Sequence, residues 1–460
     1  MRGLVVLMGV GLLALLCDGS GAVAASKKAY LKEVLAVAVA GVGLAWAVTL
    51  RQNPPGREGL LNACQTDEWK GVMQLCLLFY HYLAPSPQPL VAYTLARIIV
   101  AAFLFQTGYG RTMSALAKSS SFDPKAVFTI LLRLNLLTLV LAMATKRSWN
   151  DYYFTPLVSF WTIVFYLLHT VGVWLCPRTR VVVVGILCCL LSLNARRDPE
   201  QFSFAALFFY PLKPILSSKT TPFDTWLFRS QLDCFSPLVG AVVALNHQKL
   251  SNFLAMVQGL PPWRKGPVYV LVYIGAAGAM ALWAWPLQFV WSDAGDAAAA
   301  CVQNCSTCTT CKRCGGSNSS TYFSSASSSH AAPILECVQR RIAQEDYNYQ
   351  HHAFLCVVPC LAYVALRNLT SYCRSHSSPL LGFIGARSLE LYLLQYHLWL
   401  TDGARSILSP LHNHPSLNGL IVFPIFMLAA HAAHEASGDA VGWLVGVGCA
   451  GTREIRGRFC

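Results

Sequence analysis

Residues 268–291 read VYVLVYIGAAGAMALWAWPLQFVW and contain no charged side chain. A helix of about 20 apolar residues is long enough to cross the hydrocarbon core of a membrane, which is about 30 Å thick. Inside that core the backbone polar groups must bond to one another, so an apolar segment of this length forms a helix. The run therefore predicts a transmembrane helix.

Comparable runs recur along the whole chain, whose composition is 55% hydrophobic and only 12% charged. Soluble domains usually contain about 25% charged residues, so this composition disfavours a soluble fold. The candidate spans are residues 34–50, 71–84, 90–108, 126–144, 154–175, 181–193, 202–216, 237–245, 268–291, 354–365, 380–400, 420–434 and 441–450. Because several are short and can merge or re-enter, we predict an all-α, polytopic transmembrane helical bundle with about 10–12 spans.

The first 25 residues have the layout of a secretory signal peptide. Arg2 precedes an apolar run, Leu4–Leu16, and small residues follow at Ala22–Ser26. A retained N-terminal anchor is the alternative interpretation of the same pattern. Both interpretations place the chain in the endomembrane system.

The chain carries a formal net charge of +14, from 35 basic and 21 acidic residues. The basic residues are scattered through short connections and are not gathered on one face, so the charge predicts no nucleic-acid partner. Basic groups at residues 111–125, 146–147 and 178–180 instead indicate candidate cytoplasmic loops.

Residues 292–345 differ in composition from the apolar runs around them and are predicted to form an inserted loop. The segment is rich in serine, and its clustered cysteines are Cys301, Cys305, Cys308, Cys311 and Cys314. Disulfides or simple variability are favoured over a zinc site, because no second, distant C-x-x-C pair and no interleaved histidine accompany the cluster. Asn304, Asn318 and Asn368 lie in sequons, which predict glycosylation wherever the loop faces the lumen.

These features divide the chain into segments. In order they are a signal peptide or anchor (1–25), a first span with its loop (26–65), the first part of the membrane domain (66–291), the inserted loop (292–345), the last part of the membrane domain (346–450) and a tail (451–460). The sequence has no P-loop, no dinucleotide-binding fingerprint and no G-x-S-x-G elbow. ATP-driven transport, hydride transfer and serine-esterase chemistry are therefore disfavoured.

Polar side chains inside the apolar runs are informative, because each costs several kcal/mol in lipid unless it faces protein or water. Lys70, Gln74 and His81 occupy the sequence DEWKGVMQLCLLFYHY of residues 67–82, at offsets of 4 and 11 from the lysine. At about 100° per residue they fall within roughly 40° of one another on one helix face. Such a column can bind an acyl carrier, with His81 as general base for an attacking hydroxyl. A histidine that only packs between helices is the alternative.

Three further patterns place polar or small residues at helical spacing. Residues 105–110, FQTGYG, contain two glycines, which indicate either a broken helix with exposed amide groups or close packing of helices. Arg229 and Asp233 stand four residues apart, a spacing that favours an intrahelical ion pair. Glu390 and His397 stand seven residues apart and are predicted to share one helix face.

Two other groups of polar residues carry weaker signals. Arg133 and Asn135 lie inside an apolar run and are expected to face protein instead of lipid. His431, His434 and Glu435 cluster at helical spacing. A metal site there is disfavoured, because no third ligand is identifiable and histidine pairs on helices are frequent by chance.

Nine short motifs follow one another along the chain. They are EWKGxMQ (68–74), YHY (80–82), FQTGYG (105–110), RLN (133–135), YYFxP (152–156), FRSxLD (228–233), YNxxH (347–351), LRN (366–368) and LELxxxQYHxW (389–399). The series, which covers about residues 65–440, resembles that of the multi-spanning glycan O-acetyltransferase family. This family contains the animal sialate O-acetyltransferase, the fungal capsule O-acetylation protein and the plant reduced-wall-acetylation proteins. The animal member carries a lumenal serine-hydrolase-like domain ahead of its spans, so the layout here is expected to be similar to that of the plant proteins.

The resemblance implies a multi-pass Golgi membrane protein that transfers acetyl groups from acetyl-CoA to hydroxyls of a glycan, either a cell-wall polysaccharide or a secreted glycoconjugate. Its expected partners are the lipid bilayer and the glycan acceptor, and no metal is expected. Two alternatives stay open. The chain could carry an acetyl donor across the membrane to a separate lumenal glycan acetyltransferase, or it could act only as a scaffold for that enzyme.

On the enzyme hypothesis, the catalytic candidates are His81, Gln106, Glu390 and His397. His81 would deprotonate a sugar hydroxyl or carry the acetyl group itself. Gln106, or backbone amides near Gly108, would stabilise the oxyanion. The face shared by the other two candidates would orient the substrate or move protons.

The substrate-binding candidates are Lys70, Gln74, Tyr109, Arg133, Asn135, Arg229, Asp233 and His351. Lys70 and Arg133 would meet the anionic groups of CoA. The sequence departs from the usual motifs of the family at positions such as Val72, Arg111 and Cys234. These departures bear on the choice of acceptor more than on the acyl-transfer chemistry.

Overall fold

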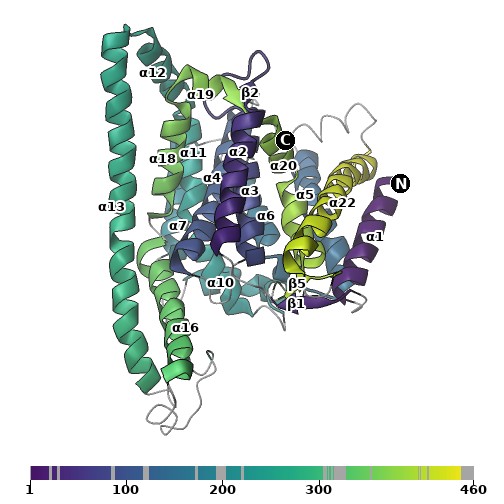
Figure 1. Ribbon diagram of the computed structural model, residues 1–460. Coiled ribbons are helices and arrows are strands. Elements are labelled where there is room, and N and C mark those ends of the chain that lie inside the picture. Colours follow the sequence, from purple (N-terminus) through teal and green to yellow (C-terminus); the bar gives the residue numbers. More distant parts are fainter. Residues whose placement is uncertain are drawn as a thin grey trace.

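The computed structural model describes residues 2–19, 23–27, 32–83, 89–117, 124–170, 175–192, 204–218, 222–303, 308, 310–311, 314, 328–352, 355–401, 404, 406–411 and 414–446. These residues form a bundle of helices with a few short strands (Figure 1). A long helical hairpin stands at one side of the bundle.

The helices up to this hairpin are α1 (Arg2–Ala14), η1 (Leu15–Gly19), α2 (Lys32–Thr49), α3 (Ala63–Leu83), α4 (Leu90–Ala117), α5 (Pro124–Thr145), η2 (Trp149–Tyr152), α6 (Phe154–Thr170), α7 (Pro177–Ser192), α8 (Phe204–Phe209), η4 (Tyr210–Leu212), α9 (Lys213–Leu216), α10 (Phe223–Leu232), α11 (Phe235–Leu245), α12 (His247–Gly259) and α13 (Pro262–Gln303). The later helices are α16 (Ser328–Asp346), η5 (Tyr347–His352), α18 (Val357–Asn368), α19 (Ser371–Ser375), α20 (Pro379–Ala386), α21 (Ser388–Leu394), η6 (Gln395–Trp399) and α22 (Pro415–Leu444). Antiparallel pairing joins β1 (Ala25–Lys27) and β4 (Leu400–Thr401) to β5 (Ser406–Leu408), and β2 (Arg51–Gln52) to β3 (His376–Ser377).

Four of the described helices are long and apolar enough to cross a membrane on their own, and a bent helix pair would make a fifth span. The four are Leu90–Ala117, Lys125–Thr145, Pro262–Gln303 and Leu417–Leu444. On α13, Leu271 is 71% exposed and Leu282 is 77% exposed. An apolar surface of this extent is stable where lipid covers it. The prediction of an all-α, multi-pass membrane bundle is confirmed.

Glycines set the closest helix contacts of the bundle. A Cβ atom on Gly71 would lie 1.9 Å from the carbonyl oxygen of Leu381, so α3 can approach α20 this closely only with glycine at that position. A Cβ atom on Gly108 would lie 1.9 Å from the carbonyl oxygen of Pro237 in α11. Helix α4 continues unbroken past this contact. The broken-helix interpretation of residues 105–110 is therefore wrong, and the packing interpretation is confirmed.

Replacement of Gly108 by alanine is expected to lower the unfolding temperature of the purified protein, because the added methyl group must displace the α11 backbone. Overpacking of a well-filled contact costs about 1–3 kcal/mol. Gly110→Ala is the matched control on the same helix, since nothing lies within 4 Å of a Cβ atom there. Equal unfolding temperatures for the two variants would contradict this account of the α4–α11 contact.

The C-terminal third differs from the predicted spans. The predicted span at residues 380–400 is divided: α20 ends before Arg387, and the turns after α21 widen into the π-helix η6. The predicted spans at residues 420–434 and 441–450 belong in part to one helix, because α22 runs without a break to Leu444.

The predicted loop at residues 292–345 is in large part a helical hairpin. Helix α13 extends to Gln303, and α16 lies along its lower half in Figure 1. At 1.5 Å per residue, the 42 residues of α13 measure about 63 Å, roughly twice the thickness of a hydrocarbon core. Helix α13 is therefore too long to lie wholly within the hydrocarbon core.

Disulfides cross-link the chain at the end of the hairpin where α13 ends and α16 begins. Cys301 is bonded to Cys308, and Cys314 is bonded to Cys337. Cys311 is disulfide-bonded as well, so of the two alternatives favoured over a zinc site the structure has the disulfides. Cys305, Asn304 and Asn318 lie outside the described residues.

The prediction of glycosylation at Asn368, the third sequon, is wrong. Asn368 is only 2% exposed, and its side-chain oxygen accepts a hydrogen bond from the backbone N–H of Leu61. Its amide nitrogen donates to the carbonyl oxygen of Val364. The side chain therefore serves the packing of α18 and is not open to a glycosylating enzyme.

The first helix is part of the bundle core. Helix α1 packs against α5 and α22, and Leu7 and Ala14 are fully buried. A Cβ atom on Gly3 would lie 2.5 Å from the carbonyl oxygen of Ala436. Cleavage after the first 25 residues would uncover the faces of α5 and α22 that α1 now buries.

The basic groups do not all lie at one end of the bundle. The 22 residues of α5 measure about 33 Å, so its two ends lie at opposite membrane faces. Residues 111–125 and 146–147 are therefore on different sides, and Arg147 is paired with Asp18 at 3.0 Å. Helix α6 crosses the bundle in the opposite direction to α5, so residues 178–180 at the start of α7 lie on the same side as the start of α5. The three basic groups therefore do not all mark loops on the same membrane face.

Candidate functional site

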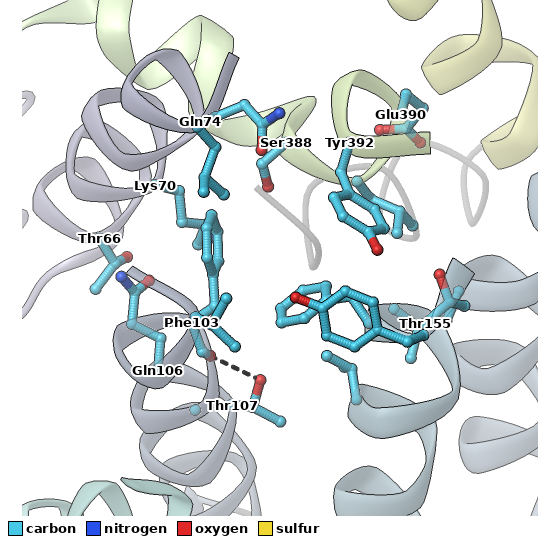
Figure 2. A pocket seen from close by; sticks show the side chains of 18 of the residues that line it. Thr66, Lys70, Gln74, Phe103, Gln106, Thr107, Thr155, Ser388, Glu390 and Tyr392 are labelled. Atoms are coloured by element: carbon cyan, nitrogen blue, oxygen red, sulfur yellow. Dashed lines mark hydrogen bonds between the residues drawn. The ribbon is translucent and has the colours of Figure 1, made fainter. Parts of the chain in front are cut away.

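A cavity of about 590 Å³ lies between α3, α4, α5, α6, α10 and the segment from α20 to η6. Small-molecule sites usually measure about 300–1,000 Å³. The predicted site residues that line it are Lys70, Gln74, His81, Gln106, Tyr109, Arg133, Arg229 and Glu390. In Figure 2, Lys70, Gln74 and Gln106 lie on one side of the cavity, and Glu390, Tyr392 and Thr155 lie on the other.

The polar column of α3 faces this cavity. Lys70, Gln74 and His81 all line it, as their spacing on one uninterrupted helix predicts. Gln106 reaches the same cavity from α4. The side chains on which the enzyme hypothesis depends are therefore joined by one space and are not packed separately against apolar neighbours.

A glutamine orients the imidazole of His81. Its Nδ1 lies 3.1 Å from Oε1 of Gln395, the first residue of η6. With the amide oxygen as acceptor, Nδ1 carries the proton and Nε2 carries the lone pair that a base needs. The ring is flanked by Tyr80 and Tyr396, with ring centroids 5.1 Å and 6.1 Å away.

Two amide side chains of the cavity have buried polar atoms without a protein partner among the described residues. These atoms are Nε2 of Gln74 and both polar atoms of the Gln106 amide. Buried polar atoms in folded proteins are nearly always hydrogen-bonded, and leaving one unpaired costs about 1–3 kcal/mol. A bound molecule in the cavity would supply the missing partners.

Neighbouring carboxylates neutralise the two cations that were predicted to meet CoA. Nζ of Lys70 lies 2.8 Å from a carboxylate oxygen of Asp67. Nη2 of Arg133 lies 2.6 Å from Oε1 of Glu390, whose other oxygen lies 3.3 Å from Nδ1 of His434. The net positive charge that these groups offer a ligand is correspondingly small.

Two other cavity-lining cations have no carboxylate partner within the described part of the chain. They are Arg111 on α4 and Arg229 on α10. The guanidinium carbon of Arg229 lies 3.8 Å from the ring centroid of Tyr153. Arg111 was not predicted as a site residue. The signal for it was the polar stripe Thr107, Gly110, Arg111 and Ser114, whose spacing of 3 and 4 residues places all four on one helix face.

The predicted intrahelical pair of Arg229 and Asp233 is wrong. Helix α10 ends at Leu232, so Asp233 lies outside the helix and points elsewhere. Its carboxylate lies 2.5 Å from Nη2 of Arg97 and 2.7 Å from Nε2 of His352.

Four predicted site residues do not line the cavity: Asn135, Asp233, His351 and His397. The amide of Asn135 donates to the hydroxyl of Ser159 at 2.9 Å and accepts from Nε1 of Trp149 at 2.7 Å, which ties α5 to its neighbours. The ring of His351 lies against Trp283 on α13, with centroids 5.8 Å apart.

His397 and Glu390 do not share a face. Nε2 of His397 lies 2.6 Å from the Tyr152 hydroxyl, and Nδ1 lies 2.8 Å from the Asp18 carboxylate. Glu390 instead meets Arg133. The π-helix turns less per residue than an α-helix, so the seven-residue spacing no longer returns to the same face.

His431 and His434 of α22 form hydrogen bonds with different residues. His431 accepts a hydrogen bond from Nε of Arg387 at 3.0 Å, whereas His434 meets Glu390. Elsewhere in the described chain, Asp233, His352 and Cys356 place potential ligand atoms within 4.8 Å of one another. The guanidinium of Arg97 already supplies positive charge to that carboxylate.

Comparison with known proteins gives two findings. The sequence pattern of a family described as the 10 TM acyl transferase domain found in Cas1p matches residues 2–265 and 317–453. The N-acetylneuraminate (7)9-O-acetyltransferase of Danio rerio is 27% identical over 394 residues. That alignment covers 83% of this chain but 42% of the zebrafish protein, so the chain spans less than half of this relative's length. No solved structure matches the chain.

Proposed function

The chain belongs to the family of the 10 TM acyl transferase domain found in Cas1p, and from this we propose that it is a membrane O-acetyltransferase. It would transfer acetyl groups from acetyl-CoA to hydroxyls of a glycan in the Golgi. The zebrafish relative is named as an O-acetyltransferase of N-acetylneuraminate, which supports a sugar as acceptor. The disulfides of the helical hairpin support a compartment with an oxidising lumen.

The observation that carries the proposal is the single cavity that joins His81, Gln74 and Gln106. Nε2 of His81 would take the proton of the acceptor hydroxyl while the hydroxyl oxygen attacks the thioester carbonyl carbon. The carbonyl oxygen then becomes an oxyanion, to which the amide N–H groups of the two glutamines would donate. Collapse of this intermediate breaks the carbon–sulfur bond. The departing thiolate takes the proton from His81, which leaves CoA as the free thiol and the sugar as its acetyl ester.

Helix directions suggest where the donor enters. Helix α3 ends at Leu83 and α4 begins at Leu90, so the two run in opposite directions. The start of α3, with Lys70, therefore lies beside the end of α4, with Arg111. We assign the phosphate groups of acetyl-CoA to this end, where no carboxylate in the described part of the chain neutralises Arg111. The thioester would then extend along α3 toward His81.

Replacement of Arg111 by alanine is expected to raise the KM for acetyl-CoA about tenfold and to change kcat less. A hydrogen bond to a charged group contributes about 1.5–3 kcal/mol, and 1.4 kcal/mol corresponds to a factor of ten in binding. The measurement is steady-state acetyl transfer by the purified protein. Arg178→Ala is the control, because this exposed arginine begins α7 outside the cavity. A KM within twofold of wild type for Arg111→Ala would remove the donor assignment.

Sealed vesicles that contain only this protein separate the enzyme from a carrier of the acetyl donor. Acetyl-CoA labelled in its acetyl group is added outside, and a sugar acceptor is supplied inside. The proposal predicts labelled acetyl ester on the sugar. Label that enters the vesicles as intact donor without ester formation would support a carrier instead, and neither result would be expected from a scaffold.

A further inference from the structure

A second cavity, of about 350 Å³, adjoins the first. Tyr93 of α4 and Phe228 of α10 line both, so the two spaces meet across these side chains. The rest of the second cavity comes from α16 and η5, chiefly Arg341, Gln344, Asn348 and Tyr349. It is therefore built where the disulfide-stapled hairpin joins the membrane bundle.

The second cavity offers both hydrogen-bond donors and acceptors. Nδ2 of Asn348 donates to the hydroxyl of Tyr93 at 2.8 Å, whereas its Oδ1 is buried and has no hydrogen-bond partner among the residues that the structure describes. Nε of Arg341 is also buried, and no described residue offers it a hydrogen bond. Glu345 lines the same cavity, so the lining includes one acidic and one basic side chain. Atoms of this kind are suited to a ligand rich in hydroxyl groups.

Aromatic rings complete the lining. The rings of Phe228 and Tyr349 lie with their centroids 5.6 Å apart, in an edge-to-face arrangement. A pyranose ring presents C–H groups on its faces and hydroxyls at its edge. Tyrosine and phenylalanine rings can therefore cover its apolar faces while amide and guanidinium groups bond to the hydroxyls.

The position of the second cavity assigns it to one side of the membrane. Arg341 stands four residues after Cys337, whose disulfide forms on the oxidising, lumenal side. In Figure 1 the α16 end of the hairpin lies opposite the end that carries α12 and α19. Tyr93 and Arg111 are 18 residues apart on α4 (111 − 93), which corresponds to about 27 Å, nearly the thickness of a hydrocarbon core. The donor end and the second cavity therefore lie toward opposite membrane faces.

We infer that the second cavity is a sugar-binding vestibule, through which the glycan acceptor reaches His81 from the lumenal side. This inference rests on the proposed function, because it names the acceptor entrance of the same site. His81 is close to this entrance, since it lies in the last turn of α3 and Tyr93 lies in the first turns of α4. The reacting sugar would enter the first cavity past Tyr93 and Phe228, while the next sugar unit stays on Asn348 and Arg341.

Binding and turnover test the vestibule separately. The full chain in lipid nanodiscs is titrated calorimetrically with N-acetylneuraminate and with a xylo-oligosaccharide, without acetyl-CoA. Arg341→Ala and Asn348→Ala are each expected to weaken binding of the accepted sugar at least tenfold. In turnover they are expected to raise the KM for that sugar by a similar factor and to leave the KM for acetyl-CoA within twofold of wild type.

Arg340→Ala is the matched control, because Arg340 is the adjacent residue on α16, pairs with Glu336 and does not line the vestibule. It is expected to bind sugar as the wild type does. Unchanged sugar binding in both vestibule variants would overturn the inference, and so would a wild-type chain that binds neither sugar. Sugar binding that depends on Arg341 without any acetyl transfer by the wild type would support the vestibule and count against the proposed function.

Discussion

Replacement of His81 by alanine is expected to lower kcat for acetyl transfer by about 10²–10⁴-fold, the usual contribution of a positioned general base. His81 lines the cavity, an imidazole is the usual general base of enzymes, and Gln395 orients the ring. The KM for acetyl-CoA should change little, because on the proposed mechanism His81 would meet the acceptor hydroxyl and not the phosphates. The measurement is steady-state transfer from labelled acetyl-CoA by purified wild type and variant.

The control for this variant is His169→Ala, which removes a partly buried histidine of α6 outside the cavity. Gln395→Ala is expected to lower kcat less than the loss of the base itself, and Gln395→Glu to retain more activity because it keeps an acceptor for Nδ1. A His81→Ala protein that unfolds at the wild-type temperature and transfers acetyl within twofold of the wild-type rate would show that His81 is not the base.

Replacement of Glu390 by alanine is expected to destabilise the protein by about 3–5 kcal/mol, because it leaves Arg133 charged and buried without its partner. The two side chains are 1% and 4% exposed, and their charged atoms lie 2.6 Å apart. The double variant Arg133→Leu with Glu390→Leu should recover much of this loss, since it removes both buried charges. The measurement is thermal unfolding in nanodiscs, with a double-mutant cycle for the pair.

An exposed pair of the same chemistry provides the comparison. Arg340 and Glu336 are paired one turn apart on α16, and the glutamate side chain is 57% exposed. Exposed pairs contribute about 0–1 kcal/mol, so Glu336→Ala should hardly change the unfolding temperature. A loss for Glu390→Ala no larger than that for Glu336→Ala would mean that the cavity solvates Arg133 and that the pair is not structural.

Local periodicity predicted the part of the site that lies on one unbroken helix. Lys70, Gln74 and His81 reach the same cavity because α3 keeps α-helical geometry from Ala63 to Leu83. The apolar runs likewise predicted the helices, because lipid leaves the backbone few other ways to satisfy its hydrogen bonds. Both arguments need information from neighbouring residues only.

Prediction failed where the helix geometry changes or where the partner is remote. The π-helix after Leu394 turns His397 away from Glu390. No residue type in a sequence predicts a π-helix. Asp233 pairs with Arg97, which lies 136 residues earlier in the chain. The spacing of Arg229 and Asp233 predicted an ion pair within one helix. That pair does not form, because α10 ends at Leu232 and Asp233 lies outside the helix.

The glycines and the hairpin show how one pattern can have two outcomes. The two glycines of residues 105–110 fit both a break and a close contact, and only the position of Pro237 in α11 decides between them. The cysteines between Cys301 and Cys314 predicted disulfides, but not that Cys337 on the next helix is one of the partners. That pairing links Cys314 to α16, the helix that contributes Arg341 to the second cavity.

The central claim is that one cavity brings a CoA thioester and a sugar hydroxyl together at His81. The most direct test is acetyl transfer by the purified chain in nanodiscs, which have no inner compartment, so transport alone cannot produce a signal. Labelled acetyl-CoA and N-acetylneuraminate or a xylo-oligosaccharide are mixed with the protein, and the sugar is analysed for acetyl ester. The account predicts labelled ester that forms with wild type and His169→Ala and falls at least a hundredfold with His81→Ala. Donor binding without ester on either sugar, or ester formed equally well without His81, would contradict it.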